Sequence, residues 1–330
     1  MNAKCTALDY IDFLIATPRI CTATEAARVQ PHHLHPPAHD AFTRLLHRLE
    51  PNADLLWIEV RPLIHRHRGV LILDDSTLDK PYAQHMDLVC WHWSGKHHDV
   101  VKGINLLTLV WNDGDTLQPC DYRIYNKSKD GLTKNDLFRQ MLDVAKERGF
   151  APECVLFDSW YASVDNLRRC DTLGFRWLTR LKPNRKVSLD GSLYHALEHF
   201  NLSSAGEVVH LHGYGRVKVF TLVAKDGQKE YWATGDVQMT ELQRLAWGEL
   251  SWGIEEYHRG LKQYCGVERA QVRAEVAQRN HIGLAIRAFV RLEVHRFRTG
   301  ISWFEAKFAI IREAVRLYLS NPLYKLTGIA

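Results

Sequence analysis

The sequence lacks the features of a membrane protein, a secreted protein or a disordered chain. No stretch of its 330 residues approaches the roughly 18 consecutive apolar residues of a membrane-spanning helix, and its start has no apolar segment typical of a secretory signal. It has no internal repeat and no low-complexity tract. With 46% hydrophobic and 25% charged residues, its composition is that of a folded protein. We therefore predict a cytoplasmic protein with no membrane partner.

Cysteine and histidine spacing gives no support for a structural metal site or a disulfide framework. The seven cysteines are odd in number, and none lies two to four residues from another. We expect reduced thiols that are mostly buried. The histidine clusters His32-His33, His35 and His97-His98 lack both a helical HExxH frame and a paired-cysteine frame, so they do not predict zinc.

The overall charge is only mildly basic, but the basic residues are concentrated in one region. The net charge of +5 and the pI near 8.8 are weak evidence for a nucleic-acid partner. Between residues 259 and 298, however, there are nine lysines and arginines and only three acids. This basic stripe predicts DNA contacts, and the candidates that we single out in it are Arg259, Lys262, Arg269 and Arg273.

Changes of pattern along the chain predict four segments. Residues 1–67 show apolar spacings of three and four typical of helices and could form a DNA-binding module, although no clean helix-turn-helix signature is present. Residues 68–182 predict the first part of an α/β core, and residues 183–240 a β-rich insertion. Residues 241–330 predict the second part of the core followed by C-terminal helices.

Within residues 68–182 the predicted order is βββ-α-β-α-β. A buried strand begins at Gly69, and a hairpin turns at Asp113-Gly114. The remaining predicted elements are a helix over 133–149, a strand over 153–159, a helix over 163–174 and a strand over 175–182.

Three acids far apart in the sequence lie where they could converge. Asp75 ends the first buried strand, Asp158 ends the fourth, and Glu255 lies on the helix after the β-rich segment, with separations of 83 and 97 residues. Strand ends of an open α/β sheet face a common crevice. Carboxylate oxygens are the ligands that Mg²⁺ prefers, and two such ions can stabilise the attacking and leaving oxygens of a phosphoryl displacement. Three carboxylates and a phosphate would balance two divalent cations.

Each acid also has a simpler interpretation. Asp158 could be only the N-cap of the next helix. Asp74 and Asp75, followed by Ser76-Thr77, could form an Asx turn. Glu255 and the adjacent Glu256 could belong to a solvated helix face.

The segment 252–264 combines an acid with two cations on one predicted helix. Glu255, Arg259 and Lys262 follow an i, i+4, i+7 spacing and share a face. That arrangement could ligate metal beside DNA phosphates, or it could be an ion pair worth a few tenths of a kcal/mol. An adjoining apolar strip, expected to pack on the sheet, is formed by Ile254, Tyr257 and Leu261.

Three blocks of the chain resemble the catalytic blocks of DDE transposases. They are LILDDSTL at 71–78, VLFDSWY at 155–161 and IEEYHRGLKQYCGVER at 254–269. The similarity is to the bacterial insertion-sequence branch, and it covers about residues 69–270 with the blocks in the right order. It implies an α/β fold in which an RNase H-like mixed sheet is flanked by helices, with an all-β insertion before the catalytic Glu and an N-terminal helical module.

The resemblance implies roles for individual residues. Asp75, Asp158 and Glu255 would be the catalytic metal ligands, with Asp74 as an alternative to Asp75, and Lys262 would contact phosphate. In the family signature a Tyr lies seven residues and an Arg four residues before the Glu, whereas this chain has Gly248 and Ser251 there. Either Arg259 or Arg244 takes over the phosphate contact of the missing Tyr and Arg, or the chain comes from a degenerate copy of the element.

The implied activity is DNA transposition with two Mg²⁺ ions, for which Mn²⁺ could substitute. The partners would be double-stranded DNA, as terminal inverted repeats and target DNA, and a second copy of the chain in a homodimer. The expected location is the bacterial cytoplasm, in association with the nucleoid. Two alternatives stay open: a non-catalytic DNA-binding remnant of the same fold, and an unrelated metal-dependent hydrolase of small phosphoesters.

Ten tryptophans are many for a chain of this length. By default we expect most of them in the core, although one in the β-rich segment could stack on an exposed base. The ones considered are Trp91, Trp93, Trp160, Trp232 and Trp252.

Overall fold

The computed structural model describes residues 4–31, 36–94, 99–126, 129, 131–224 and 227–322. The histidine clusters at His32, His33 and His35 and at His97 and His98 lie outside these residues. Within them, no helix is both long enough and apolar enough to cross a membrane. The chain divides into two compact units. The helical unit comprises Met1–Asn52, Tyr82–Val89 and His258–Ala330, and the core unit comprises Ala53–Pro81 and Cys90–Tyr257.

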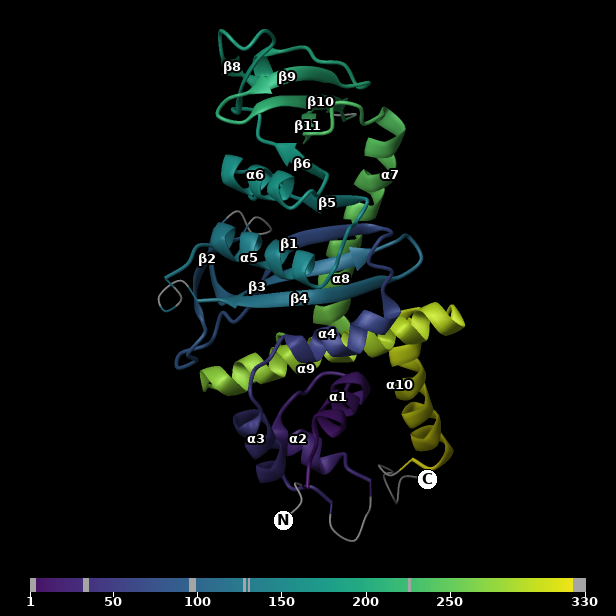
Figure 1. Ribbon diagram of the computed structural model, residues 1–330. Helices are drawn as coiled ribbons and strands as arrows, with labels where there is room; N and C mark the ends of the chain where they lie inside the picture. Colours follow the sequence, from purple (N-terminus) through teal and green to yellow (C-terminus); the bar gives the residue numbers. More distant parts are fainter. Residues whose placement is uncertain are drawn as a thin grey trace. The chain divides into compact units, whose positions relative to one another are not determined.

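The helical unit joins the two ends of the chain (Figure 1). Its first helices, α1 and α3, pack against the long helix α9. Side chains at the start of these helices close them, as where Thr6 and Asp9 form a reciprocal capping box on α1. The helices are α1 (Ala7–Ala16), α2 (Ala23–Arg28), α3 (His39–Arg48), the end of α8 (Gly253–Tyr264), α9 (Glu275–Thr299) and α10 (Trp303–Ser320).

Buried polar contacts hold these ends together. The hydroxyl of Tyr10 lies 3.0 Å from Nδ1 of His281 on α9. The side-chain amide of Asn280 donates to the carbonyls of Leu46 and Leu49 at 2.8 and 2.6 Å. All three polar side chains are almost fully buried, so these bonds fix how α1 and α3 meet α9.

The core unit is built on one mixed sheet with the order β2-β3-β1-β5-β6-β11-β10-β9-β7-β8, in which β4 also pairs with β3 (Figure 1). The first strands are β1 (Val70–Asp79), β2 (Cys90–Ser94), β3 (Asp99–Asn112), β4 (Leu117–Tyr125), β5 (Cys154–Phe157) and β6 (Trp177–Leu181). The β-rich segment adds β7 (Lys186–Ser188), β8 (His195–Ala196), β9 (Glu207–Leu211), β10 (Gly215–Val223) and β11 (Lys229–Thr234).

The centre of this sheet follows the predicted pattern. Strand β1 pairs antiparallel with β3 and parallel with β5, and the β3–β4 hairpin turns at Asp113-Gly114, where Gly114 has a φ of 95°. The β-branched and leucine side chains of β1 before its acids are fully buried. The predicted hairpin and the strands at β1, β5 and β6 are confirmed, but the prediction that Asp75 ends the first strand is wrong. Strand β1 continues to Asp79, because residues 76–79 keep pairing with β3. Strand β2 was not predicted.

Helices of the core unit complete the mixed α/β arrangement that the sequence predicts. Thr133 and Ser163 cap α5 and α6 as N-cap residues, and α6 lies beside β5 and β6 in Figure 1. These helices are α4 (Asp54–Val60) with the short 3-10 turn η1 (Arg61–Leu63), α5 (Lys134–Glu147), α6 (Val164–Thr172), η2 (Leu197–His199) and α7 (Glu241–Ser251).

The expectation that the tryptophans are mostly core is wrong for four of the five considered. Trp232 is buried, but Trp91, Trp93, Trp160 and Trp252 are between 51% and 65% exposed. The size and apolarity of an indole favour burial, but these four positions lie on an edge strand or next to a turn, where one face of the ring meets solvent. None of the seven cysteines, all of which the structure describes, forms a disulfide, and six are buried, as predicted.

Candidate active site

Asp74 and Asp75 are adjacent on β1 but point to opposite faces of the sheet. Successive side chains of a strand alternate, and the pairing register places Asp74 opposite Thr108 and Asp75 opposite Leu107. The two acids therefore meet different surroundings. The sequence left open which of the two is the first metal ligand, and the pairing register now shows which face of the sheet each one occupies.

Asp75 lies on the face covered by α5, where three donors hold its carboxylate. Oδ2 accepts from Lys134 Nζ at 2.7 Å and from Asn105 Nδ2 at 2.6 Å, while Oδ1 accepts from the Tyr161 hydroxyl at 2.5 Å. Burial acts to raise the pKa of Asp75, but the Lys134 charge and the three hydrogen bonds outweigh it and hold that pKa below its ordinary value. Asp75 is already an anion with a cationic partner.

Asp74 lies on the other face, towards the junction of α7 and α8. Asn112 shares that face, because its alternation along β3 matches that of Thr108. The Asn112 amide donates to the Leu250 carbonyl at the end of α7 at 3.0 Å. Helix α8, which carries Glu255, begins three residues later at Gly253. The same face of the sheet thus carries Asp74 and supports the start of the Glu255 helix.

The closeness of this contact explains the glycine at the start of α8. A Cβ at Gly253 would lie 2.6 Å from Asn112 Nδ2 and 3.2 Å from Leu117 Cδ1. A side chain there requires either that α8 moves away from β3 or that the Asn112 amide leaves the Leu250 carbonyl. Gly253 therefore sets how closely the Glu255 helix approaches the strand next to β1.

Asp158 directly follows β5, the parallel neighbour of β1. Leu73 pairs with Phe157, so the residue after each of them, Asp74 and Asp158, lies on the same side of neighbouring strands. Oδ1 of Asp158 accepts from the backbone N–H of Trp160 at 2.9 Å in an Asx-type turn. Asp158 keeps a solvent-exposed side, but partial burial and the charge of Asp75 raise its pKa against the opposing effect of this hydrogen bond.

The electrostatics show that these acids act on one another. Burial raises the pKa of Asp74 well above its ordinary value, and the charges of Asp158, Asp75 and Glu255 raise it further. Within the described ranges, however, no group of three or more His, Cys, Asp or Glu side chains is placed to hold a metal ion. The structure therefore gathers carboxylates that repel one another, without the spacing of a formed metal site.

This donor set fits a divalent metal. The groups whose charges raise the pKa of Asp74 all offer carboxylate oxygens, which suit hard cations. These carboxylates repel one another, and a bound divalent cation would neutralise their negative charge. Lys134 binds Asp75, which lies on the opposite face of the sheet from Asp74.

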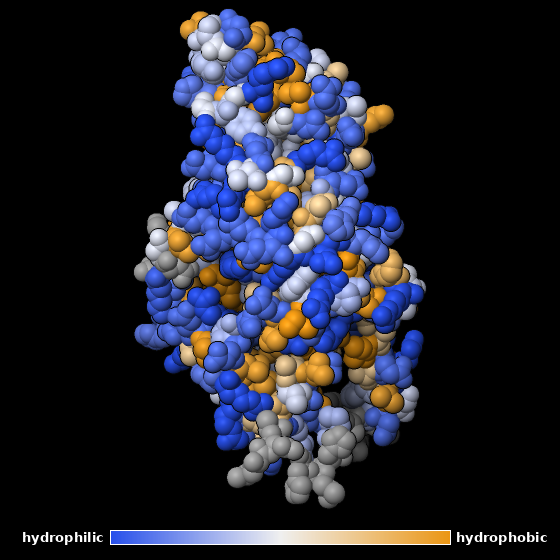
Figure 2. Space-filling view, viewed as in Figure 1, coloured by the Kyte–Doolittle hydropathy of each residue, from blue (hydrophilic) through white to orange (hydrophobic). Residues whose placement is uncertain are grey.

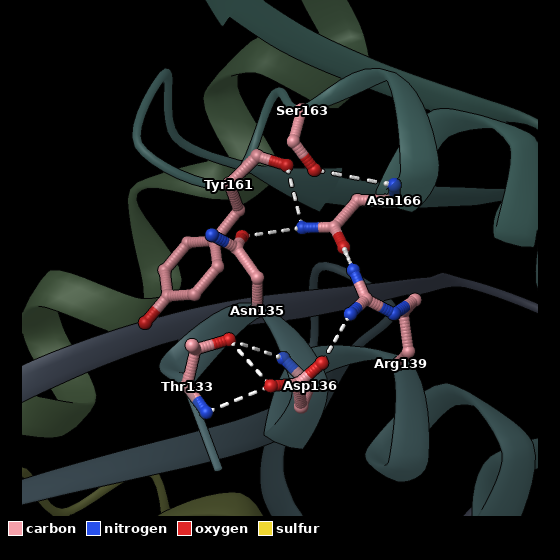
Figure 3. A network of polar contacts seen from close by, with 7 residues as sticks. All are labelled: Thr133, Asn135, Asp136, Arg139, Tyr161, Ser163 and Asn166. Carbon is pink, nitrogen blue, oxygen red and sulfur yellow. Dashed lines mark hydrogen bonds and ion pairs between the residues drawn. The ribbon is translucent and has the colours of Figure 1, made fainter. Parts of the chain in front are cut away.

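A polar network fixes the elements that hold Asp75 (Figure 3). The buried Asn166 amide donates to Asn135 Oδ1 at 2.7 Å and to the Tyr161 carbonyl at 2.9 Å, and its oxygen accepts from Arg139 at 2.8 Å. Arg139 also binds Asp136, which forms the capping box with Thr133 at the start of α5. The N-terminus of α5, where Lys134 lies, is thereby tied to the segment that presents Tyr161.

The predicted residues of α8 divide into a buried strip and an open side. Glu255 and Arg259 are exposed, and Lys262 is partly buried and pairs with Glu268 at 3.0 Å. The predicted apolar strip is confirmed, since Ile254, Tyr257 and Leu261 are all buried.

The remaining predicted DNA contacts lie in the helical unit. Arg273 is exposed. Arg269 donates to the Pro18 carbonyl at 2.8 Å, so it also has a structural role. Arg259 and Lys262 belong to the same unit, because the boundary between the units falls after Tyr257.

The missing family Tyr and Arg have no obvious replacement in α7. Arg244 is 3% exposed and lies over the Phe220 ring at 6.0 Å from its centroid, so it cannot grip a phosphate without leaving the core. Ser251 donates its hydroxyl to the Gly248 carbonyl at 2.6 Å. Of the two candidates considered, only Arg259 has an exposed side chain.

Sequence reasoning missed the residues that hold Asp75. Lys134, Asn105 and Tyr161 come from a helix start, a strand interior and a turn, and no local spacing connects them. The one usable sign is Asn105 itself, an amide within an otherwise apolar run of β3, because a buried amide needs a polar partner.

Two protein families match this sequence over more than half its length each. Residues 4–196 match the family described as "DDE superfamily endonuclease". The chain belongs to the DDE superfamily. Residues 125–303 of this DDE transposase also match the family described as "Archaeal putative transposase ISC1217". Enzymes of this class act on DNA and generally use divalent metals. No curated protein matches the sequence.

The fold of the DDE transposase is also found in a solved structure. The cryo-EM structure of a piggyBac transposase synaptic complex with hairpin DNA is similar to 98% of this chain and 77% of that one, with a TM-score of 0.54 and 10% sequence identity. At that identity the similarity concerns the fold alone. It agrees with the predicted α/β fold of a large mixed sheet flanked by helices.

Proposed function

We propose that this DDE transposase cleaves DNA strands at the ends of a mobile element and joins the freed 3′ ends to target DNA. The observation that carries the proposal is the shared electrostatic environment of Asp74, Asp158 and Glu255. These acids come from β1, from the residue after β5 and from α8, and no structural need of the fold explains why the charges of Asp158 and Glu255 should raise the pKa of Asp74.

Asp74, Asp158 and Glu255 are the ligands that the geometry favours for two Mg²⁺ ions, for which Mn²⁺ could substitute. When bound, the ions would activate the attacking oxygen and stabilise the leaving oxygen of the phosphodiester. The three side chains would have to draw closer to share them, since their present spacing forms no metal site. Asp75, which the sequence favoured as the first ligand, would instead position β1 through Lys134, Asn105 and Tyr161.

The DNA partners would be the terminal inverted repeats and the target duplex, bound by a homodimer. Arg259 and Arg273 present exposed charge for phosphates, and Lys262 could exchange its Glu268 partner for one. Arg269, already bonded to the Pro18 carbonyl, would contribute through its remaining donors.

Strand cleavage tests the proposal. The full chain is incubated with a plasmid that carries the DNA flanking its own reading frame, in Mg²⁺, in Mn²⁺ or in EDTA. We expect metal-dependent nicks at the element ends, lost in Asp74→Asn, Asp158→Asn and Glu255→Gln, while each variant still binds the same DNA. The matched control is Glu256→Gln, the neighbouring exposed acid of α8.

The alternatives make different predictions for the same assay. A chain that binds the ends but never cuts in either metal would be the non-catalytic remnant, which the absence of the family Tyr and Arg at Gly248 and Ser251 favours. Turnover of a small phosphoester that survives loss of Arg259 and Arg273 would indicate the small-substrate hydrolase.

A further inference from the structure

An exposed aromatic surface lies on the β2–β3 ribbon of the core unit. Trp91 and Trp93 are 65% and 58% exposed and lie two residues apart on β2, so their indoles share one face. Their cross-strand partners on β3 are Lys102 for Trp91 and Val100 for Trp93. We call these four residues the tryptophan face.

The opposite face of the ribbon is packed, which fixes the tryptophan face outward. His92, between the two tryptophans, is buried, with its Nε2 3.0 Å from Cys90 Sγ and its ring against Tyr125. The indoles are thus not side chains of a loose loop. They are held on a strand whose other side is anchored in the core unit.

Two lysines lie at the tryptophan face. Lys102 lies beside Trp91, and the backbone N–H of Lys80 donates to the Lys102 carbonyl at 2.9 Å, which brings a second lysine next to it. The nearby acids Asp79 and Asp99 pair with Gly103 and Ser94, so strand alternation places their side chains on the other face.

We propose that the tryptophan face binds single-stranded DNA, with two unpaired bases stacked on Trp91 and Trp93. The indoles are about 6.6 Å apart along the strand, whereas bases in a duplex are stacked roughly 3.4 Å apart and hide their faces. Only an extended, unpaired strand can therefore offer one base to each ring. Exposed aromatic rings beside positive charge are the usual means by which proteins hold such strands.

The ribbon lies close enough to the acids for a DNA strand separated there to reach the tryptophan face. Asp79, the last residue of β1, pairs with Gly103 where the ribbon begins, and it lies five residues beyond Asp74, about 17 Å along the strand. A strand separated at the acids could reach the tryptophan face within a few extended nucleotides. The binding itself requires neither metal nor cleavage, so it can be tested independently of the proposed function.

The test measures binding of labelled oligo(dT) to the full chain in EDTA, by fluorescence anisotropy. We expect Trp91→Ala and Trp93→Ala each to weaken binding by about five- to a hundredfold. Phenylalanine at either position should keep most of the affinity, whereas leucine should not, because stacking needs an aromatic ring. Leu193→Ala, which removes another exposed apolar side chain of the core unit, should change nothing.

Two further measurements make the outcome decisive. Binding of a duplex of equal length should be unaffected by all these variants, and Lys80→Gln with Lys102→Gln should reduce the salt dependence of oligo(dT) binding by about 0.7 per lysine in the logarithmic slope. Unchanged oligo(dT) affinity in the alanine variants would overturn the proposal. If sedimentation then showed that the same variants dissociate an oligomer, the tryptophan face would be an interface between copies of the chain.

Discussion

Asp74 and Asp75 are neighbours in the sequence, yet the Asp75 carboxylate is bound by Lys134 at 2.7 Å while the Asp74 carboxylate faces the side of the sheet where α8 begins. The charge of Asp75 is therefore compensated within the fold. The pKa of Asp74 is raised by burial, and further by the charges of Asp158, Asp75 and Glu255. A charge kept at such a cost is typical of a functional site rather than of a structural one.

Asparagine substitutions at these two positions should have opposite effects on stability. Asp74→Asn removes a repelled charge, so the metal-free protein should be as stable as the wild type or more stable at neutral pH. Asp75→Asn leaves the largely buried Lys134 ammonium without its anion and should cost about 1–3 kcal/mol. Urea unfolding of each variant in EDTA measures both changes.

The effect of divalent metal on the unfolding midpoint should also distinguish Asp74→Asn from Asp75→Asn. Mg²⁺ or Mn²⁺ should raise the unfolding midpoint of the wild type and of Asp75→Asn, but not that of Asp74→Asn, because a ligand that binds only the folded state stabilises it. If Asp75→Asn instead loses the metal response and Asp74→Asn keeps it, Asp75 is the ligand.

Alanine at Gly253 should uncouple the Glu255 helix from the sheet. Its Cβ would lie 2.6 Å from Asn112 Nδ2, so either α8 or the Asn112 amide that holds the Leu250 carbonyl must shift, at a cost of about 1–3 kcal/mol. We expect a weaker metal response as well, since Glu255 lies two residues further along the helix. Thermal unfolding with and without Mn²⁺ measures both effects.

Gly248 provides the matched control for this change. It lies inside α7, and a Cβ there would meet Trp232 at 3.9 Å, an ordinary contact. Gly248→Ala should therefore be neutral or stabilise the protein by up to about 1 kcal/mol through helix propensity. Equal behaviour of the two alanine variants would contradict a special role for the Gly253 approach to β3.

The sequence was sufficient to find the elements that carry the acids, and insufficient to orient them. Apolar runs ending in acids predicted β1 and β5, and Asp113-Gly114 predicted the β3–β4 turn, because these signals are local. The choice between Asp74 and Asp75 depends on which face of β1 meets α5. That depends on contacts such as Lys134 to Asp75, 59 residues apart, which leave no trace in local pattern.

The prediction that most of the tryptophans are buried failed for a related reason. Hydrophobicity predicts that an indole is buried on average, but exposure depends on whether another element covers that face of the strand. On β2 the buried residue is His92, supported by Cys90 and Tyr125, and the indoles on either side are left outside. Figure 2 likewise shows hydrophobic residues as patches among hydrophilic ones on the face that it draws.

Asn166 should be one of the most sensitive polar positions of the core unit. It is fully buried, and alanine would remove two donated bonds, to Asn135 and to the Tyr161 carbonyl, and one accepted from Arg139. We expect the free energy of unfolding, measured in urea, to fall by about 2–4 kcal/mol, because the former hydrogen-bond partners of Asn166 stay buried without a partner. Ser163→Ala, which removes only the cap of the same helix, should cost about 1 kcal/mol. Similar losses for both variants would mean that the network adds nothing beyond the cap.

Lys307 should give the helical unit a stability that increases with pH. This lysine of α10 is 4% exposed, and it donates to the carbonyls of Leu14 and Tyr264 at 3.0 and 2.9 Å. Burial lowers its pKa from 10.5 to about 8. Between these values the unfolded chain holds a proton that the folded chain has released, so stability should increase with pH across this window, by roughly 3 kcal/mol at most.

Lys307→Met isolates this effect from the other groups that titrate nearby. The pKa of Cys265 is raised to about 12 by burial, which makes stability decrease as pH rises above 9.0, but that thiol is present in both proteins. The difference in unfolding free energy between wild type and Lys307→Met should therefore shift in favour of the wild type from pH 8 to 10.5. Parallel pH profiles in urea unfolding would show that Lys307 keeps its proton in the folded state and that its two carbonyl partners hold it as an ammonium.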